Sequence, residues 1–279
     1  MAVAPLRALI TAGFEIPVVI TRPDKRRGRG SGASPSPVKA VAAELGLHVS
    51  HDLSEATSAG AEVGVVVAYG RIIPVAVLEA LPMVNLHFSL LPRWRGAAPV
   101  ERAVLAGDQV TGVCVMEVEE TLDTGAVYRR QEVPIGSSQT AAELRSELVT
   151  VGAGLLVETL RAGLIEPEPQ AGEPTYADKI INEELRLDWS RPVVELDRVV
   201  RVGGAWTTVV GKRLKVWQAE VSDDAVERPL PAGTVEGDRV ATGVGWLRLV
   251  TVQPEGKGRQ AAADWLRGAR LSAGERLGR

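Results

Sequence analysis

Short apolar runs alternate with helical patterns along the first two thirds of the chain. The runs are rich in β-branched side chains and are bounded by turn residues, a combination that predicts strands. They lie at residues 18–21, 63–68, 84–88 and 113–118. Because helical patterns separate them, they are typical of βαβ units. We therefore expect an α/β domain built on a doubly wound, mostly parallel sheet.

The predicted helices begin and end at recognisable signals. One starts at Ser36 and stops at Gly46, and Pro74 opens a short one. Thr140 and Glu143 form a capping box at the start of the longest helix. The apolar residues of this helix are spaced to form one buried stripe against the sheet: Leu144, Leu148, Val151 and Leu155.

The pattern changes after residue 164. Residues 165–184 hold three prolines and many charges without periodicity, which predicts a surface linker. Beyond a helix near residues 196–202, short β-like runs are separated by Gly, Asp and Pro turns, and this spacing predicts a small, OB-like barrel. The runs lie at residues 206–210, 214–218, 233–235, 239–242 and 246–252. The expected parts are an α/β domain, 1–164, a linker, 165–184, and a β-barrel domain, 185–279.

Composition is that of a soluble globular protein. Of 279 residues, 45% are hydrophobic and 24% charged, and no apolar run approaches the roughly 18 residues of a membrane span. One cysteine, Cys114, excludes an internal disulfide framework, and three histidines leave little scope for a zinc site. The first residues lack the pattern of a signal peptide, so we expect a cytoplasmic protein.

The net charge of −3 is unevenly distributed, with −7 on residues 1–200 and +4 on residues 201–279. Basic side chains crowd one short stretch of the acidic part: Arg22, Lys25, Arg26, Arg27 and Arg29. Only Asp24 opposes them there. Such a concentration can hold a polyanion, although a solvated arginine-rich loop is the commoner outcome of a charge run.

The polar side chains that best indicate a functional site lie in residues 85–99, NLHFSLLPRWRGAAP. If the run is extended, its period of two puts Asn85, His87 and Ser89 on one face. At the carboxyl end of a parallel strand, these side chains project toward the crevice where open α/β sheets bind ligands. For a lone histidine, a hydrogen-bonded role in the core is the commoner outcome.

Two further segments favour a site. LDTG, residues 122–125, follows the next strand, so Asp123 is expected at the same edge of the sheet as His87. A carboxylate beside an imidazole orients it and favours its charged form, as proton handling requires. VVAYGRIIP, residues 66–74, would form one apolar wall of a pocket. The alternative for LDTG is a plain Asx-type turn.

These runs resemble the formyltransferases that use 10-formyltetrahydrofolate, over nearly the whole chain. Further stretches that carry the resemblance are TRPDKRRGRG, SPVK, KVWQAEV and VATGVGWLRLVTVQPEGKG. SLLPRWRGAAP is typical of the tRNA-directed members, because relatives acting on nucleotide sugars or glycinamide ribonucleotide generally differ after the arginine-glycine pair. The resemblance implies transfer of a formyl group from 10-formyltetrahydrofolate, as co-substrate, to the α-amine of initiator methionyl-tRNA, for translation initiation.

The resemblance also assigns roles. Asn85, His87 and Asp123 fall on the family's catalytic trio. The positions that fall on folate-contacting segments are Ser89, Leu90, Leu91, Pro92, Tyr69, Gly70 and Ile72. Arg29 falls on the arginine for the tRNA acceptor end, in a basic loop whose other candidate tRNA contacts are Arg22, Lys25 and Arg27. No metal is implied, and a monomer is the default expectation.

Two departures from the family pattern stand out. Members begin with a strand and a glycine-threonine-proline loop, whereas this chain starts directly with a predicted helix, residues 5–12. Because the first strand is central in the doubly wound order, its loss would leave its neighbours unpaired, and an incorrectly assigned start is the explanation we favour. The connection at residues 202–206 is also shorter than the family's proline-containing one.

Two alternatives remain open at this point. A formyltransferase for a small amine, such as an amino sugar nucleotide, would keep the same trio and have no need of a basic barrel. An inactive, truncated remnant would bind folate or RNA weakly and catalyse nothing.

Overall fold

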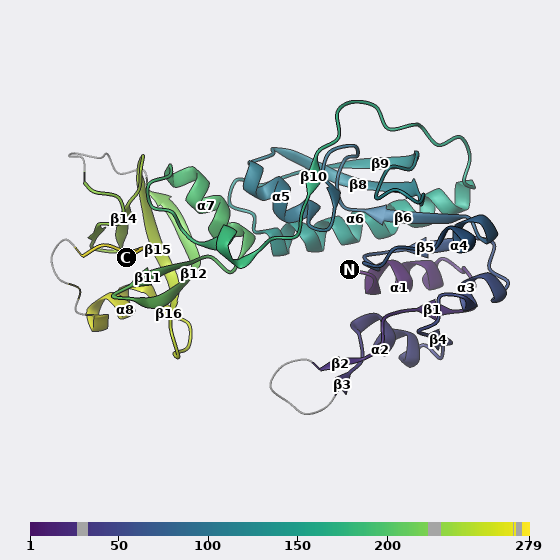
Figure 1. Cartoon of the computed structure of the whole chain (residues 1–279), viewed down its shortest axis with the longest axis horizontal. Coiled ribbons are helices and arrows are strands. Elements are labelled where there is room, and N and C mark those ends of the chain that lie inside the picture. The colour runs from purple at the N-terminus through teal and green to yellow at the C-terminus, as the bar shows by residue number, and fades with distance from the viewer. Residues whose placement is uncertain (27–32, 223–229, 270, 272–274) are drawn as a thin grey trace. The chain divides into compact units, whose positions relative to one another are not determined.

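The computed structural model describes residues 1–26, 33–222, 230–269, 271 and 275–279 (Figure 1). The chain divides into two compact units. The N-terminal unit comprises Met1–Val100, Val110–Pro134 and Leu144–Asp178. The C-terminal unit comprises Glu101–Gln109, Ile135–Glu143 and Lys179–Arg279.

A four-stranded mixed sheet forms the centre of the N-terminal unit. Its strands, in spatial order, are β5 (Gly64–Val66), β6 (Met83–His87), β8 (Val110–Glu117) and β9 (Val127–Pro134). β5 and β6 are parallel, while β8 runs antiparallel to β6 and to β9. The α/β class is confirmed, but the expectation that the strand at 113–118 runs parallel is wrong, because β8 and β9 form a hairpin.

Two short parallel strands, β1 (Val19–Ile20) and β4 (Val49–Ser50), form a separate sheet. Within the described residues, β1 pairs only with β4 and β5 pairs only with β6. This break lies where the doubly wound order would place a central strand between β1 and β5. The two sheets share no strand pairing among the described residues.

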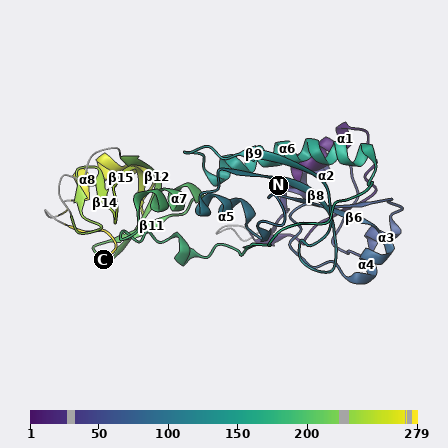
Figure 2. The ribbon, with the colours of Figure 1, turned by 90° about the horizontal axis from the view of Figure 1, so that it is seen from above.

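Helices cover the sheets of the N-terminal unit. They are α1 (Val3–Thr11), α2 (Pro37–Glu44), α3 (Glu55–Ser58), α4 (Val75–Ala80) and α6 (Ala141–Ala162). Figure 2 shows α6 running alongside the four-stranded sheet. The predicted capping box is present, since the Thr140 amide donates to Glu143 Oε2 at 2.9 Å and the Glu143 amide donates to Thr140 Oγ1 at 3.3 Å. Of the predicted stripe on α6, Leu144, Leu148 and Leu155 are buried.

The segment after α6 pairs with strands of the N-terminal unit. Glu168 bridges Val127 of β9. β10 (Tyr176–Ala177) then runs parallel to β7 (Arg95–Gly96). Within the expected linker, Glu168 thus bonds to β9, and β10 bonds to β7, which follows β6.

The C-terminal unit is built on a six-stranded antiparallel sheet. Its strands are β11 (Trp206–Val209), β12 (Lys212–Ser222), β15 (Trp246–Pro254), β14 (Arg239–Ala241) and β13 (Val235–Glu236), with β16 (Gln260–Ala261) also on β15. No strand pairing among the described residues joins β11 to β13, so the sheet stays open and the expected barrel is not closed.

An apolar cluster of the C-terminal unit includes Leu196, Leu214, Leu247 and Trp265. These side chains come from α7 (Val193–Val202), the central strands and α8 (Ala262–Ala269). The remaining helical elements are α5 (Pro99–Ala106) and the 3-10 helix η1 (Asn182–Leu185). None of the described helices is both long enough and apolar enough to cross a membrane.

Candidate active site

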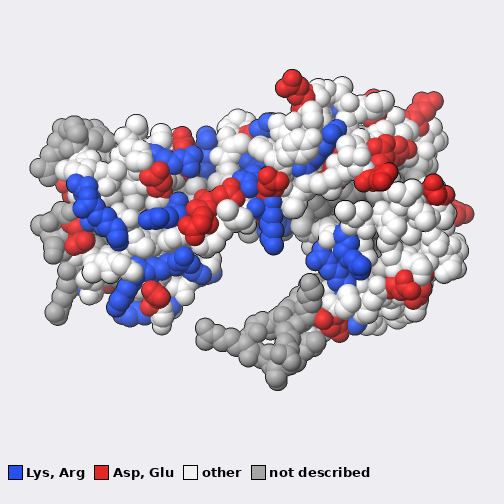
Figure 3. Space-filling model, in the orientation of Figure 1, with Lys and Arg blue, Asp and Glu red and all other residues white. Residues whose placement is uncertain are grey.

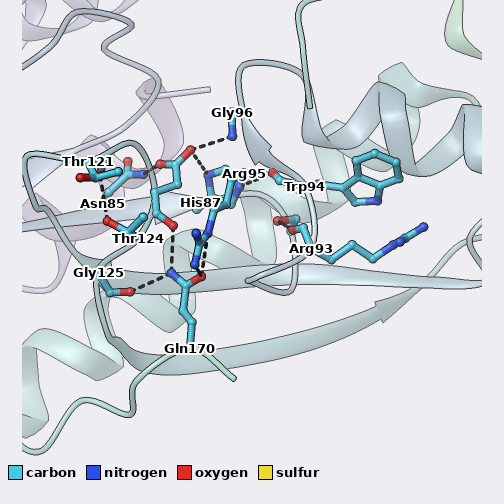
Figure 4. A network of polar contacts seen from close by, with 12 residues as sticks. Asn85, His87, Arg93, Trp94, Arg95, Gly96, Thr121, Thr124, Gly125 and Gln170 are labelled. Atoms are coloured by element: carbon cyan, nitrogen blue, oxygen red, sulfur yellow. Dashed lines mark hydrogen bonds and ion pairs between the residues drawn. The ribbon is translucent and has the colours of Figure 1, made fainter. Parts of the chain in front are cut away.

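The structure brings Asn85, His87 and Asp123 together (Figure 4). Asn85 and His87 lie two positions apart on β6, so the pleat directs them to the same face, as predicted. Asp123 comes from the turn between β8 and β9. The antiparallel β8 ends beside the start of β6, and the turn then returns the carboxylate toward His87.

Both ring nitrogens of His87 face oxygen acceptors. Nε2 lies 2.9 Å from the Trp94 carbonyl, and Nδ1 lies 3.6 Å from Asp123 Oδ2. An imidazolium has an N–H on each nitrogen and satisfies both acceptors, whereas neutral imidazole satisfies one. The ring is therefore held between the Trp94 carbonyl and the Asp123 carboxylate.

Asp123 receives hydrogen bonds from two elements. The Gly96 amide donates to Oδ2 at 2.8 Å, and Asn85 Nδ2 donates to Oδ1 at 3.4 Å. The backbone of Asp123 has φ +52°, in the left-handed region that non-glycine residues rarely adopt. Close packing also fixes the turn at Gly125, where a Cβ would lie 2.2 Å from the Glu117 carbonyl oxygen.

The structure adds Gln170 and Arg95 to this network, and sequence reasoning missed both. Gln170 Nε2 donates to the carbonyls of Asp123 and Gly125, and its Oε1 accepts from the Arg95 guanidinium. Gln170 stands in an aperiodic segment between prolines, where no pattern singles out one polar residue. Arg95 lies inside the quoted motif, yet nothing in its spacing indicates a glutamine partner.

The positions expected to contact folate fall into buried and exposed groups. Ser89 is fully buried and donates from Oγ to the Arg93 carbonyl at 2.6 Å, and Leu91 packs in an apolar cluster with Cys114. Leu90 and Pro92 are half-buried, and Ile72 is 88% exposed. The Tyr69 hydroxyl is buried and finds no hydrogen-bond partner among the described residues.

Arg22, expected to contact tRNA, is engaged with the loop that holds Tyr69 and Gly70. Its Nε and Nη2 donate to the Tyr69 carbonyl at 3.0 and 2.8 Å, and Nη2 also donates to the Gly70 carbonyl at 2.9 Å. Lys25 lies in β2 (Lys25–Arg26), which pairs with β3 (Ala33–Ser34). The other expected contacts, Arg27 and Arg29, lie outside the described residues.

Asp24, the acid within the basic stretch, is itself neutralised. Lys39 Nζ lies 2.9 Å from one carboxylate oxygen of Asp24 and 3.0 Å from the other. Because Lys39 neutralises the charge of Asp24, Asp24 does not offset the positive charge of the arginines around it.

The thiol of Cys114, the one cysteine of the chain, is unsuited to nucleophilic chemistry. Cys114 lies opposite His87 in the β6–β8 ladder and is completely buried. Burial raises the pKa of its thiol, and only the thiolate is strongly nucleophilic. In the part of the chain that the structure describes, no cluster of three or more His, Cys, Asp or Glu side chains is placed to hold a metal ion.

Basic and aromatic side chains meet on the C-terminal unit, whose visible face carries many Lys and Arg side chains (Figure 3). The Arg259 guanidinium lies 3.3 Å from the centre of the Trp217 ring, and Lys215 Nζ lies 5.7 Å from it. Gln253 accepts a hydrogen bond from Trp217 Nε1 and donates to the Lys257 carbonyl. We call Lys215, Trp217, Lys257 and Arg259 the Trp217 surface.

The three cations of the Trp217 surface are exposed and have no carboxylate partner among the described residues. No described carboxylate offsets their charge, and the Arg259 guanidinium stacks on the Trp217 ring. Arg213 lies 3.9 Å from the centre of the Trp206 ring in the same sheet, which extends the basic and aromatic character along β12.

An α/β unit with a buried His–Asp pair and an adjacent amide has the groups that an acid–base transferase of the acyl-transfer type requires. Residues 4–160 match the family model described as "Formyl transferase", and residues 179–270 match "Formyl transferase, C-terminal domain". The chain belongs to the formyl transferase family.

Curated relatives match over the whole chain. The methionyl-tRNA formyltransferase of Dinoroseobacter shibae is 45% identical over 290 residues, which covers 98% of this chain and 95% of the relative. The methionyl-tRNA formyltransferase of Thiobacillus denitrificans is 43% identical over 298 residues and covers 99% of this chain and 96% of the relative.

Solved structures share the fold. An N-formyltransferase from Helicobacter canadensis, in complex with folinic acid and dTDP-3-aminofucose, aligns with a TM-score of 0.67 at 17% identity, covering 89% of this chain and 95% of that one. A methionyl-tRNA formyltransferase from Clostridium thermocellum aligns with a TM-score of 0.51 at 16% identity, covering 67% of this chain and 88% of that one.

Proposed function

We propose that the chain transfers the formyl group of 10-formyltetrahydrofolate to the α-amino group of initiator methionyl-tRNA. The observation that carries the proposal is the His87–Asp123 pair beside Asn85, in a chain 45% identical to a methionyl-tRNA formyltransferase over nearly its whole length. The protein would act in the cytoplasm, as a monomer, in translation initiation.

The residues near the trio fit a folate donor. The buried Tyr69 hydroxyl lacks a partner among the described residues, so a polar group of a ligand would satisfy it. Exposed Ile72 offers apolar surface in the same loop. In this proposal the donor contacts Tyr69, Gly70 and Ile72 on one side. On the other side it contacts the segment 89–92 through the half-buried Leu90 and Pro92, because Ser89 and Leu91 are buried.

Asn85 and His87 would stabilise the charge that develops during transfer. The donor supplies an activated formyl carbon, and attack by the methionyl amine places negative charge on the formyl oxygen. The second amide hydrogen of Asn85 would donate to that oxygen, and the Nδ1–H of His87 would be shared between that oxygen and Asp123 Oδ2, which lies 3.6 Å away. Each such donor contributes on the order of 3 kcal/mol in the transition state.

Asp123 would hold His87 charged and move the amine's proton. As the bond from the amine nitrogen to the formyl carbon forms, the bond from that carbon to the folate nitrogen breaks. The amine's proton passes through Asp123, directly or by a water, to the leaving nitrogen. General acid–base help of this kind contributes about 10²- to 10⁴-fold. The products are formylmethionyl-tRNA and tetrahydrofolate.

The tRNA would be held by two basic regions. Arg22, Lys25, Arg27 and Arg29 would meet the acceptor stem, and the Trp217 surface would bind the phosphate backbone. Support comes from the clustered charge in the sequence and from the cations around Trp217, which have no carboxylate partner among the described residues. Neutralising phosphates releases counterions, so binding would weaken steeply as salt rises.

Formylation by the purified chain tests the proposal. The chain is incubated with 10-formyltetrahydrofolate and methionyl-tRNA, and formylmethionyl-tRNA is measured against a His87→Ala control. Formylation by the parent and not by the control supports the proposal. Formylation of an amino sugar nucleotide, with none of methionyl-tRNA, would replace it with the small-amine alternative, and no formylation of either would favour the inactive remnant.

A further inference from the structure

Gln170 holds the turn that carries Asp123. Its Nε2 donates to the carbonyl of Asp123 at 2.9 Å and to that of Gly125 at 2.8 Å. The two carbonyls lie on either side of Thr124, so both hydrogens of the Gln170 amide bind the same turn (Figure 4). Because Asp123 has φ +52°, this turn depends on partners outside itself to keep its shape.

Arg95 fixes the direction in which the Gln170 amide points. Its Nε and Nη2 donate to Gln170 Oε1 at 3.0 and 2.7 Å. A guanidinium only donates and a backbone carbonyl only accepts. If the amide were reversed, its hydrogens would face the Arg95 guanidinium and its oxygen would face the two carbonyls. The hydrogens of Gln170 must therefore face the Asp123 turn.

Arg95 and Gly96 together secure both ends of Asp123. The Gly96 amide binds the carboxylate directly at 2.8 Å, and the Arg95 side chain reaches the Asp123 carbonyl through Gln170. Since Arg95 and Gly96 are adjacent in β7, the two routes close a ring. The ring holds Oδ2 at its position 3.6 Å from His87 Nδ1.

Gln170 is anchored on both sides along the chain. Glu168 exchanges two backbone hydrogen bonds with Val127, at 2.8 and 2.9 Å. The Thr175 carbonyl accepts from the Arg95 amide at 2.9 Å, ahead of β10. The half-buried Gln170 side chain is therefore presented by a segment fixed to β9 and to β7.

We propose that Gln170, oriented by Arg95, is a positioning residue for Asp123. It keeps the carboxylate in place for proton transfer and acts only through Asp123. The inference rests on the proposed function, because the rate of formyl transfer is the quantity that Asp123 would control.

Two substitutions in the full-length chain test the role. Gln170→Ala removes the whole contact. Gln170→Glu keeps the size and an acceptor for Arg95 but loses both hydrogens that face the turn. Both are expected to lower kcat by about 10- to 10²-fold, as misplacement of a catalytic group does, while the KM of each substrate changes by less than about 3-fold.

The control is Gln131→Ala, which removes an exposed glutamine of β9 whose amide donates to the Glu132 carbonyl. It should keep the parent kcat. Full kcat in Gln170→Glu or in Gln170→Ala would overturn the proposal. Because Gln170→Glu retains the Arg95 contact, it keeps the test decisive should Gln170→Ala fail to fold.

Coupling to Asp123 separates positioning from a general structural role. In an Asp123→Asn background, adding Gln170→Ala should lower kcat by less than about 2-fold, because residues that act through one another are not additive. The same fold-loss in both backgrounds would overturn the proposal. A parent chain that does not formylate methionyl-tRNA would instead contradict the proposed function, so the two failures are distinguishable.

Discussion

The Nδ1 atom of His87 lies 3.6 Å from Oδ2 of Asp123, and the two side chains are only 5% and 10% exposed. In such a water-poor setting a charge acts more strongly on its neighbour than it does in bulk water. With Nε2 directed at the Trp94 carbonyl, the ring cannot turn freely. The pair is therefore held in one arrangement before any substrate arrives.

Removing the charge of Asp123 tests this arrangement. Asp123→Asn preserves the shape of the side chain but loses the negative charge and the capacity to carry a proton. We expect kcat for formyl transfer to fall by about 10²- to 10⁴-fold, with little change in KM, in steady-state assays. Asp52→Asn, an exposed carboxylate elsewhere in the same unit, is the matched control. An unchanged kcat in Asp123→Asn would contradict the assigned role.

The Trp217 surface is tested by the salt dependence of tRNA binding. Lys215→Ala and Arg259→Ala should each raise the KM for tRNA and reduce the slope of log K against log salt by about 1, because one phosphate contact is lost. Arg267→Ala serves as control, since that charge is already paired with Asp264. A slope that stays at the parent value in both variants would rule out this surface.

Arg22 is expected to influence the folate site as well as tRNA. Its guanidinium donates three hydrogen bonds to the carbonyls of Tyr69 and Gly70. Arg22→Ala should therefore raise the KM for the folate donor by several-fold, about 1 kcal/mol for lost hydrogen bonds of this kind. Steady-state titration of each substrate in turn measures the effect. A rise confined to the KM for tRNA would assign Arg22 to nucleic acid alone.

Replacing two glycines of α6 by alanine is expected to change stability to different extents. Gly154 is exposed and a Cβ there meets nothing within 4 Å, so Gly154→Ala should raise the free energy of unfolding by about 0.5–1 kcal/mol. A Cβ at Gly152 would lie 3.1 Å from Leu86 Cδ2, so Gly152→Ala should lose that gain to crowding. Denaturant unfolding of both variants measures the difference, and equal stabilisation would contradict it.

The lowered pKa of Glu184 is expected to account for part of the acid sensitivity of the C-terminal unit. Hydrogen bonds from the Arg102 guanidinium hold the pKa of Glu184 below its ordinary value. A lowered pKa in the folded state stabilises the fold above the unfolded pKa of about 4.3, and that stabilisation is lost as the pH falls through the lower folded value.

The melting temperatures of the parent and of Glu184→Gln, followed from pH 7 downward, measure this contribution. The parent should melt higher near neutral pH, and the difference should shrink as the pH falls below about 4. Glu183→Gln removes the same charge from the neighbouring position and should follow the parent. A difference between parent and Glu184→Gln that does not depend on pH would contradict the linkage.

Local signals in the sequence were sufficient for several features. The capping box of Thr140 and Glu143 and the buried stripe of α6 follow from spacing alone, because a helix repeats within a few residues. The shared face of Asn85 and His87 follows from the pleat of one strand in the same way.

Other features depend on contacts that a local pattern does not encode. An apolar run reads the same in either direction, so the antiparallel course of β8 was not predictable. Asp123 still reaches His87, by way of a hairpin turn rather than a parallel strand end. Gln170 meets Arg95 across 75 positions of sequence, a distance over which periodicity carries no information.

The pairing of β7 with β10 bears on how the protein is made. Arg95 and Gly96 emerge from the ribosome long before Tyr176 and Ala177, which are their partners. Contacts between residues so distant in sequence form late, after the loop between them has closed. A nascent chain that ends at residue 164 would already contain all of the trio, yet it would lack the segment that secures the turns around it. Synthesis must continue through residue 177 before these turns can be complete.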